Sequence, residues 1–517
     1  MKNYDVFYGG IFKTITDYKL LKIQKDIKNN MTALVSSFKW VGIGQLVKIA
    51  TQLVSLFYLT HLIPPSSYGL LAMSSVVMNL ASIFNDMGTG AAVIQRQEAS
   101  IGFYNYIYRI NIFTGLFVML LVIITSPLIV VYFNTPELYP VLFLLAFSFP
   151  ISSLTITHKA KLEKEMNFKV IIAIEIFSSL TGMVLAIVLA NLGFGVYSLI
   201  FQTLTTISIS TICFLKVSGL SLSLRIKNIS HSDKSGVIGF SGYLLSFNLI
   251  NYFSRNLDSI LIGRFFSSAI LGVYSIAYRI MLFPLQSLTL VFSRVFLPHL
   301  SKNINNTNNT NNTNKQDYLN ALKLILSLSA PLMLGLSATS FSFTRIFFDP
   351  KWHLLGDLLH WLAPTAIIQS ALSTTGSVFM AYGKTRWLFF LGCIGAFLMG
   401  LSFIIGVHFD IKTLVYLYFF ANLINSLPAF ILLKNILKFS YIELVNVFFR
   451  TISPAFLMFL LIKVWQHFSF FKNASIDFSF NVALGIFSYI VFYTLFNFNE
   501  VVRTGVIHKL RCMTKLK

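Results

Sequence analysis

The sequence predicts an all-helical integral membrane protein, and three observations support this fold class. Of the 517 residues, 56% are hydrophobic and only 11% are charged, whereas soluble domains carry about 25% charged residues. The mean hydropathy of +0.73 requires an apolar solvent around most of the chain. Apolar stretches of about 20 residues, the length that crosses a membrane as a helix, recur between short polar breaks. Soluble enzymes, disordered chains, coiled coils and disulfide scaffolds are therefore excluded.

About fourteen stretches meet this length requirement and are predicted to be membrane-spanning helices. Each is bounded by polar, glycine or proline residues that interrupt the apolar run. In chain order, the predicted spans are residues 40–61, 69–93, 110–133, 139–157, 170–190, 195–215, 237–263, 270–297, 321–347, 356–381, 387–408, 412–433, 444–465 and 479–497.

The polar breaks between spans predict which side of the membrane each one faces. The breaks at residues 63–67, 134–136 and 191–193 contain turn residues and no Lys or Arg, so the positive-inside rule predicts that they face outward. Both ends of the chain are basic and are predicted to be cytoplasmic, which requires an even number of spans. The net charge of +22 is interpreted as this topology signal and not as a nucleic-acid surface. The intervening, cytoplasmic breaks carry Lys159, Lys161, Lys164, Lys169, Lys216, Arg225, Lys227, Lys234, Lys384, Arg386, Lys434, Lys438 and Arg450.

No segment outside the spans is long enough for a catalytic domain, because domains begin near 50 residues. The function must therefore lie within or beside the helix bundle. The Lys-rich head lacks the apolar core of a signal peptide, and either Met1 or Met31 is the start of the native chain. The predicted organisation is a cytoplasmic extension at 1–30, a first lobe of helices 1–6 at 31–216, a cytoplasmic linker at 217–235, a second lobe of helices 7–12 at 236–438, helices 13–14 at 439–500, and a basic cytoplasmic tail at 501–517.

The two lobes are predicted to be internal repeats. A shift of 203 residues places residues 61–69, at the end of the first span, over residues 264–272, at the end of the seventh. Spans one to six and seven to twelve then form two pseudo-symmetric, parallel six-helix repeats, and the last two spans are an addition. Transporters built from such repeats bind substrate between their halves.

The same shift aligns two polar stripes inside the first helix of each repeat. The polar residues are spaced by 3, 4 and 3 positions in both helices, which places them on one helical face. A polar face is costly in lipid, so each stripe is predicted to line a lumen between the lobes. Gln45, Lys48, Gln52 and Ser55 of span one fall on Asn248, Asn251, Arg255 and Asp258 of span seven.

The charges on and near these stripes predict an anionic ligand. Counting about 1.5 Å per residue places Arg255 and Arg279 both about 10 Å below the outer surface, where they are expected to hold one anion between them. Lys48 lies nearer the middle of the membrane, and Asp86 and Glu175 lie near the inner end. Cations outnumber acids in this predicted lumen, and the planar guanidinium suits phosphate oxygens.

Several of these charges also have a purely structural interpretation. Arg255 and Asp258 can neutralise each other three residues apart on one helix. Glu175 can pair with Lys169, and Arg264 is interpreted as an anchor at the membrane edge. Two roles remain for the acids of the predicted lumen, namely coupling to H⁺ or Na⁺ and ion pairing. These acids are Asp258, Asp86 and Glu175.

Motifs for bond-making chemistry are missing from the sequence. There is no GxxxxGK[ST] phosphate loop, HExxH, GxSxG or paired-cysteine motif. No catalytic residue, metal site or cofactor is therefore predicted, and the protein is not expected to be an enzyme.

Three segments of the first lobe carry a resemblance to a known family. They are Phe57–Gly69, Phe84–Gly88 and Val93–Glu98, and residues 256–263 and 271–279 are the counterpart in the second lobe. These segments resemble polysaccharide exporters of the Wzx type, especially the colanic acid exporter branch, from about residue 31 to the end of the chain.

The resemblance implies membership of the multidrug, oligosaccharidyl-lipid and polysaccharide exporter superfamily. Such proteins move undecaprenyl-pyrophosphate-linked oligosaccharides across the inner membrane, and a polysaccharide polymerase and other assembly proteins are the expected partners. Under this hypothesis Arg255, Arg279 and Lys48 hold the pyrophosphate, and the two lobes give alternating access. The alternatives are a drug or metabolite antiporter of the same broad fold and a membrane polysaccharide polymerase or ligase.

Overall fold

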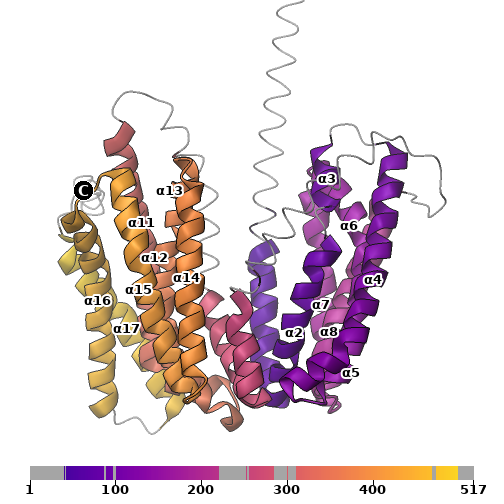
Figure 1. Cartoon of the computed structure of the whole chain (residues 1–517). Coiled ribbons are helices and arrows are strands. Elements are labelled where there is room, and N and C mark those ends of the chain that lie inside the picture. Colours follow the sequence, from indigo (N-terminus) through magenta and orange to yellow (C-terminus); the bar gives the residue numbers. More distant parts are fainter. Residues whose placement is uncertain are drawn as a thin grey trace, which may run out of the picture. The chain divides into compact units, whose positions relative to one another are not determined.

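The computed structural model describes residues 44–86, 89–96, 100–220, 255–283, 310–468 and 473–498, together with residues 40, 42, 252 and 300. Within these ranges the chain consists of helices and turns, and no strand occurs (Figure 1). Ten of the described helices are long and apolar enough to cross a membrane. The prediction of an all-helical, multi-pass membrane protein is confirmed, whereas the count of fourteen spans and the side on which each terminus lies stay predictions.

The described part of the chain divides into two compact units. The first contains residues 44–62, 77–131 and 136–220, and the second contains residues 63–76, 132–135 and 252 onward. Two short segments of the predicted first lobe therefore belong to the second unit. The predicted linker between the lobes, residues 217–235, falls mostly on residues 221–235, outside the described residues.

Hydropathy located the helices of the first unit well, because each apolar span satisfies its own backbone hydrogen bonds in the membrane. The main difference is that the predicted span 139–157 consists of two helices that meet at Phe147, the second of which continues through Lys164. The helices are residues 44–62, α2 (Pro65–Asp86, of which residues 65–76 belong to the second unit), α3 (Thr89–Gln95), α4 (Ile101–Phe133, of which residues 132–133 belong to the second unit), α5 (Leu138–Ala146), α6 (Ser148–Lys164), α7 (Phe168–Asn191) and α8 (Val196–Val217).

Small and polar residues bring the helices of the first unit together. A Cβ at Gly182 of α7 would overlap the side chain of Thr206 of α8, so glycine permits the close approach of these helices. Asn111, fully buried on α4, accepts a hydrogen bond from Thr89 (2.7 Å) and donates one to Thr157 on α6 (3.2 Å). Asn111 is thus paired with side chains of two neighbouring helices, as a buried polar group requires.

In the second unit, α11 is the central helix and contacts α12, α16 and α17. The last two helices, α16 and α17, pack against each other and against α11. The helices are residues 255–265, Ser268–Phe283, α11 (Thr310–Phe347), a 3₁₀ turn η1 (Pro350–Trp352), α12 (Leu354–Ser373), α13 (Thr375–Ala381), α14 (Thr385–Gly406), α15 (Ile411–Leu437), α16 (Tyr441–Phe468) and α17 (Ala474–Phe496).

Two glycines mark a reciprocal crossing within the second unit, between the start of α2 and the helix Ser268–Phe283. A Cβ at Gly69, near the start of α2, would overlap the carbonyl oxygen of Ser268. A Cβ at Gly272 would overlap the carbonyl oxygen of Pro65 and would lie 2.9 Å from the backbone nitrogen of Gly69. The 203-residue shift relates Gly69 to Gly272 and Pro65 to Ser268. The crossing is therefore approximately two-fold, and only glycine fits at both positions.

Candidate functional site

The helices at 255–265 and Ser268–Phe283 form an antiparallel pair in the second unit. The side chain of Leu271 lies 3.3 Å from the Cβ position of Gly263, and the Tyr274 hydroxyl donates to Asp258 Oδ2 at 2.8 Å. Further from the turn at 266–267, Arg255 interacts electrostatically with Tyr278. Continuing the antiparallel register of the contacts 263–271 and 258–274 brings residue 255 opposite roughly residue 278, so residues 255 and 279 lie at similar levels along the pair.

Arg255 and Arg279 are both solvent-exposed, and neither has a hydrogen-bond or ion-pair partner among the described residues. Tyr68, only 4% exposed, interacts electrostatically with Arg279 and packs edge-on against Trp352, 5.3 Å between ring centroids. The buried hydroxyl of Tyr68 also has no hydrogen-bond partner in the described part of the chain. Two exposed guanidinium groups are thus available to an anion from this part of the unit, and the Tyr68 hydroxyl is buried nearby.

The one acid on the same helix does not neutralise Arg255. Asp258 is 6% exposed and accepts hydrogen bonds from the Tyr274 hydroxyl and, at 2.6 Å, from the backbone N–H of Ser259. No ion pair joins it to Arg255 within the described ranges. The structure therefore does not support the interpretation that these two charges cancel on their own helix.

In the first unit, three charged side chains from three helices are paired with one another. Glu175 on α7 accepts one hydrogen bond from the ammonium group of Lys48, on the first helix, and another from that of Lys159, on α6, at 2.7 Å. Glu175 does not pair with Lys169, whose ammonium group lies 5.3 Å from the ring centroid of Trp40. Three helices thus meet at one carboxylate.

Lys159 is the member of this group that the sequence analysis missed. It was assigned to a cytoplasmic break because hydropathy falls where the charged residues begin, but α6 continues through Lys164 and carries Lys159 toward Glu175. The spacing of Lys159 and Glu163, four residues apart with opposite charge, is typical of a helix and was the available signal.

The other predicted lumen residues are placed only in part. Gln45 and Gln52 are exposed on the first helix, and Ser55 is buried and accepts a hydrogen bond from Gln202 at 3.1 Å. Arg264 donates to the backbone oxygen of Tyr132 and lies 5.5 Å from its ring centroid, which suits an anchor. Their position on a lumen between the lobes stays a prediction. Asn248 and Asn251 lie outside the described residues, and of Asp86 only the backbone, at the end of α2, is described.

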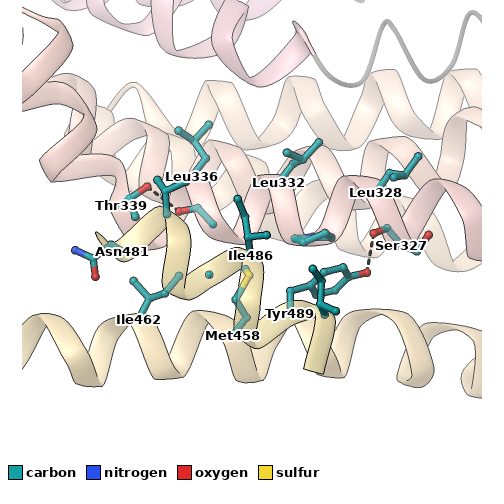
Figure 2. Close-up of a pocket in the computed structure, with 15 residues that line it drawn as sticks. Ser327, Leu328, Leu332, Leu336, Thr339, Met458, Ile462, Asn481, Ile486 and Tyr489 are labelled. Carbon is teal, nitrogen blue, oxygen red and sulfur yellow. Dashed lines mark hydrogen bonds between the residues drawn. The ribbon is translucent and has the colours of Figure 1, made fainter. Parts of the chain in front are cut away.

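A separate cavity of about 460 Å³ lies between α11, α16 and α17 (Figure 2). Its walls are mainly aliphatic, with Leu332, Met458 and Ile486 among them. The Tyr489 hydroxyl, at the edge of the cavity, donates a hydrogen bond to the backbone oxygen of Ser327 at 2.6 Å. This cavity offers no cation to a phosphate group, so the candidate anion site is the antiparallel pair with Arg255 and Arg279.

Comparison with known proteins gives a family, two relatives and a fold. The sequence model of the family described as "Polysaccharide biosynthesis protein" matches residues 58–355. The chain is 27% identical over 433 residues to the teichuronic acid biosynthesis protein TuaB of Bacillus subtilis (strain 168), covering 82% of this chain and 86% of that one. It is 26% identical over 409 residues to the lipopolysaccharide biosynthesis protein WzxC of Escherichia coli (strain K12), covering 79% and 82%.

Among solved structures, the fold is similar to that of the lipid II flippase MurJ in an inward closed conformation. The TM-score is 0.71 over 90% of this chain and 100% of that one, at 15% sequence identity. At this identity the likeness concerns the fold alone. The residues matched by the family model include Arg255, Arg279, Lys159 and Glu175.

Proposed function

The chain belongs to the polysaccharide biosynthesis protein family, and on this premise we propose that it is a flippase for lipid-linked oligosaccharides. Its substrate is an oligosaccharide repeat unit carried on undecaprenyl pyrophosphate, and it crosses the inner membrane from the cytoplasmic to the outer leaflet. The relatives named for teichuronic acid and lipopolysaccharide biosynthesis support this class of substrate, and the fold shared with a lipid flippase supports this type of transport.

The observation that carries the proposal is the pair of unpartnered arginines at one level of the second unit. An arginine side chain in the membrane costs at least about 2.5 kcal/mol even on the mildest scale, so two without a described carboxylate partner need a ligand or water. Pyrophosphate supplies oxygens that match the guanidinium fork, and charge-assisted hydrogen bonds of this kind are the strong ones. Arg255 and Arg279 bind the pyrophosphate.

Transport by this site needs no bond to be made or broken in the substrate. The two repeats alternate access to the site, the sugars pass along the polar stripes, and the polyprenyl chain stays in the lipid. Asp258, buried against Tyr274, and Asp86 are the acids through which H⁺ or Na⁺ coupling would act. A polysaccharide polymerase consumes the unit after transport.

The test is the leaflet in which lipid-linked repeat units are found in cells that lack the protein. The cells are complemented with wild type, with the double variant Arg255→Ala/Arg279→Ala, or with Arg345→Ala/Arg386→Ala, which removes two exposed arginines away from the site. We expect units to accumulate in the cytoplasmic leaflet and to be cleared by wild type and by the control variant only.

Two other outcomes would replace the proposal. If units reach the outer leaflet without the protein and stay unpolymerised there, the protein is a polymerase or ligase. If their distribution is unaffected and export of a small cationic compound is lost instead, it is a drug or metabolite antiporter.

A further inference from the structure

We propose that Lys48 and Lys159 form a second site for a phosphate-type anion, in which Glu175 is the resident counter-ion that the anion displaces. The identity of the anion, the diphosphate of the transported lipid, rests on the proposed function. The site itself rests on the geometry of the first unit.

The two ammonium groups are already arranged around an anionic group, the carboxylate of Glu175. The ammonium group of Lys159 meets Glu175 Oε1 at 2.7 Å, and that of Lys48 meets Oε2. The two lysines come from different helices and converge on the two oxygens of one carboxylate. A phosphate group also presents several oxygens on one centre, each able to accept from an ammonium group. It can therefore take the place of the carboxylate with little movement of either lysine.

The three side chains are accessible enough to exchange partners. The exposed fractions are 33% for Lys48, 36% for Lys159 and 22% for Glu175. A fully buried pair would trap its charges, since breaking it leaves an uncompensated charge in an apolar interior. At these exposures, water or a ligand can reach the ammonium groups while Glu175 turns away.

Charge balance explains why a carboxylate occupies the site when no ligand is bound. The other charged group that faces the cluster is Glu163 on α6, which interacts electrostatically with Lys159 and Glu175 but has no hydrogen bond or ion pair with a described residue. On α8, the residue that can titrate and that packs near this cluster is Cys213, which contacts the hydrophobic group of Ile171, Ile174 and Phe214. Two carboxylates then balance two ammonium groups, so the cluster without ligand is neutral. A neutral cluster costs less inside the membrane while the ligand-free protein returns to its starting conformation.

The experiment measures binding of inorganic pyrophosphate to the purified full-length protein by calorimetry. All variants carry Arg255→Ala/Arg279→Ala, so that binding to the arginine pair does not contribute. Glu175→Gln removes the competing charge and keeps the shape, and we expect pyrophosphate affinity to rise at least tenfold. Adding Lys48→Ala or Lys159→Ala to Glu175→Gln should abolish that gain.

The matched control is Glu443→Gln, which removes a carboxylate paired with Lys315 at 2.9 Å on other helices and should leave affinity unchanged. If Glu175→Gln folds, as shown by a monodisperse elution, and affinity does not rise, Glu175 is a structural brace and the proposal is overturned. If Glu175→Gln does not fold, Glu175→Asp, with a shorter reach to both lysines, is measured, and the absence of any gain overturns the proposal equally.

The source of the anion is distinguished by repeating the measurement in nanodiscs of phosphatidylcholine alone or with phosphatidylglycerol. Competition by phosphatidylglycerol would support the site and assign it to bilayer headgroups, whereas undiminished pyrophosphate binding would support the site and assign it to the diphosphate of the transported lipid. Because binding is measured without transport, a failure of the leaflet test leaves this result standing, and the reverse also holds.

Discussion

In the first repeat, Lys48 shares the carboxylate of Glu175 with Lys159, whereas Arg255, on the corresponding helix of the second repeat, has no carboxylate partner among the described residues. The two helices carry polar residues in the same register, yet their surroundings differ. Partners for the first stripe come from α6 and α7, while the acid on the second helix, Asp258, is held by Tyr274. The comparison shows that residue spacing determines on which face of a helix a charged side chain lies. Whether that side chain has a carboxylate partner depends on the residues of the neighbouring helices.

The largest effect is expected at the glycine crossing of the second unit, whose two glycines the 203-residue shift relates to each other. Gly69→Val and Gly272→Val each force a side chain into a backbone carbonyl that cannot move aside. Overpacking costs about 1–3 kcal/mol in ordinary cores, and backbone overlap should cost more. We expect both variants to lose most of the monodisperse protein recovered from membranes, and to lose it equally. Gly376→Ala, at a position with open space, is the control, and a large loss for only one of the two variants would disprove the reciprocity of the crossing.

The next effect separates stability from transport in the two stripes. Lys48→Gln removes a charged hydrogen bond to Glu175, which should lower the free energy of unfolding by roughly 1.5–3 kcal/mol. Arg255→Gln breaks no hydrogen bond or ion pair with a described residue, so its unfolding free energy should change by less than about 0.5 kcal/mol. Arg255→Gln should nevertheless reduce transport at least tenfold. Thermal unfolding in detergent measures the stability of both variants, and the leaflet assay measures their transport. A strongly destabilised Arg255→Gln would show that this arginine is structural.

A smaller effect is expected from the acid of the second stripe. Tyr274→Phe removes the hydroxyl that donates to Asp258 and leaves a buried carboxylate oxygen unsatisfied, at a cost of about 1–3 kcal/mol. The double variant Tyr274→Phe/Asp258→Asn should lower the free energy of unfolding by less than the sum of the two single effects, because both side chains belong to one contact. Full additivity of the unfolding free energies would mean that the two side chains do not depend on each other.

The smallest effect is expected from an acid outside the membrane-spanning helices, which gives a baseline for the others. Asp410 caps α15 by accepting from the backbone N–H of Thr413 at 3.0 Å, and hydrogen bonding to Thr413 lowers the pKa of its carboxyl. A lowered pKa adds stability above the pKa of the unfolded chain, and this stability is lost as pH falls through the folded value. Asp410→Ala should cost about 1 kcal/mol at pH 7 and less in acid. Asp410→Asn, which keeps an acceptor, should lose less, and an equal loss in both would argue against the cap.

The helices could be predicted from sequence because each span satisfies its own backbone, so length and hydropathy suffice. The 203-residue shift also identified the residues of the glycine crossing, since both glycines lie in the aligned segments. The contact between them was not predictable, because an alignment states which residues correspond and not which ones meet.

The ion pairs of the candidate site could not be predicted. Lys48 and Glu175 are 127 residues apart, and their contact depends on how α7 packs against the first helix. Helical spacing alone also left open that Arg255 and Asp258 neutralise each other. In the structure the Tyr274 hydroxyl, on the neighbouring helix, and the adjacent N–H of Ser259 donate to the Asp258 carboxylate instead, which spacing along one helix cannot indicate.

The glycine crossing has a consequence for how such a chain can be assembled. Gly69 meets the segment that begins at Ser268, and Gly272 meets the segment that begins at Pro65, so the contact is self-complementary in the way of an isologous dimer interface. A shorter chain holding one repeat would offer the same surface to a second copy of itself. Gene duplication and fusion can convert such a dimer into a single chain without inventing a new contact, and once the copies are fused, each glycine restricts what the other repeat can become.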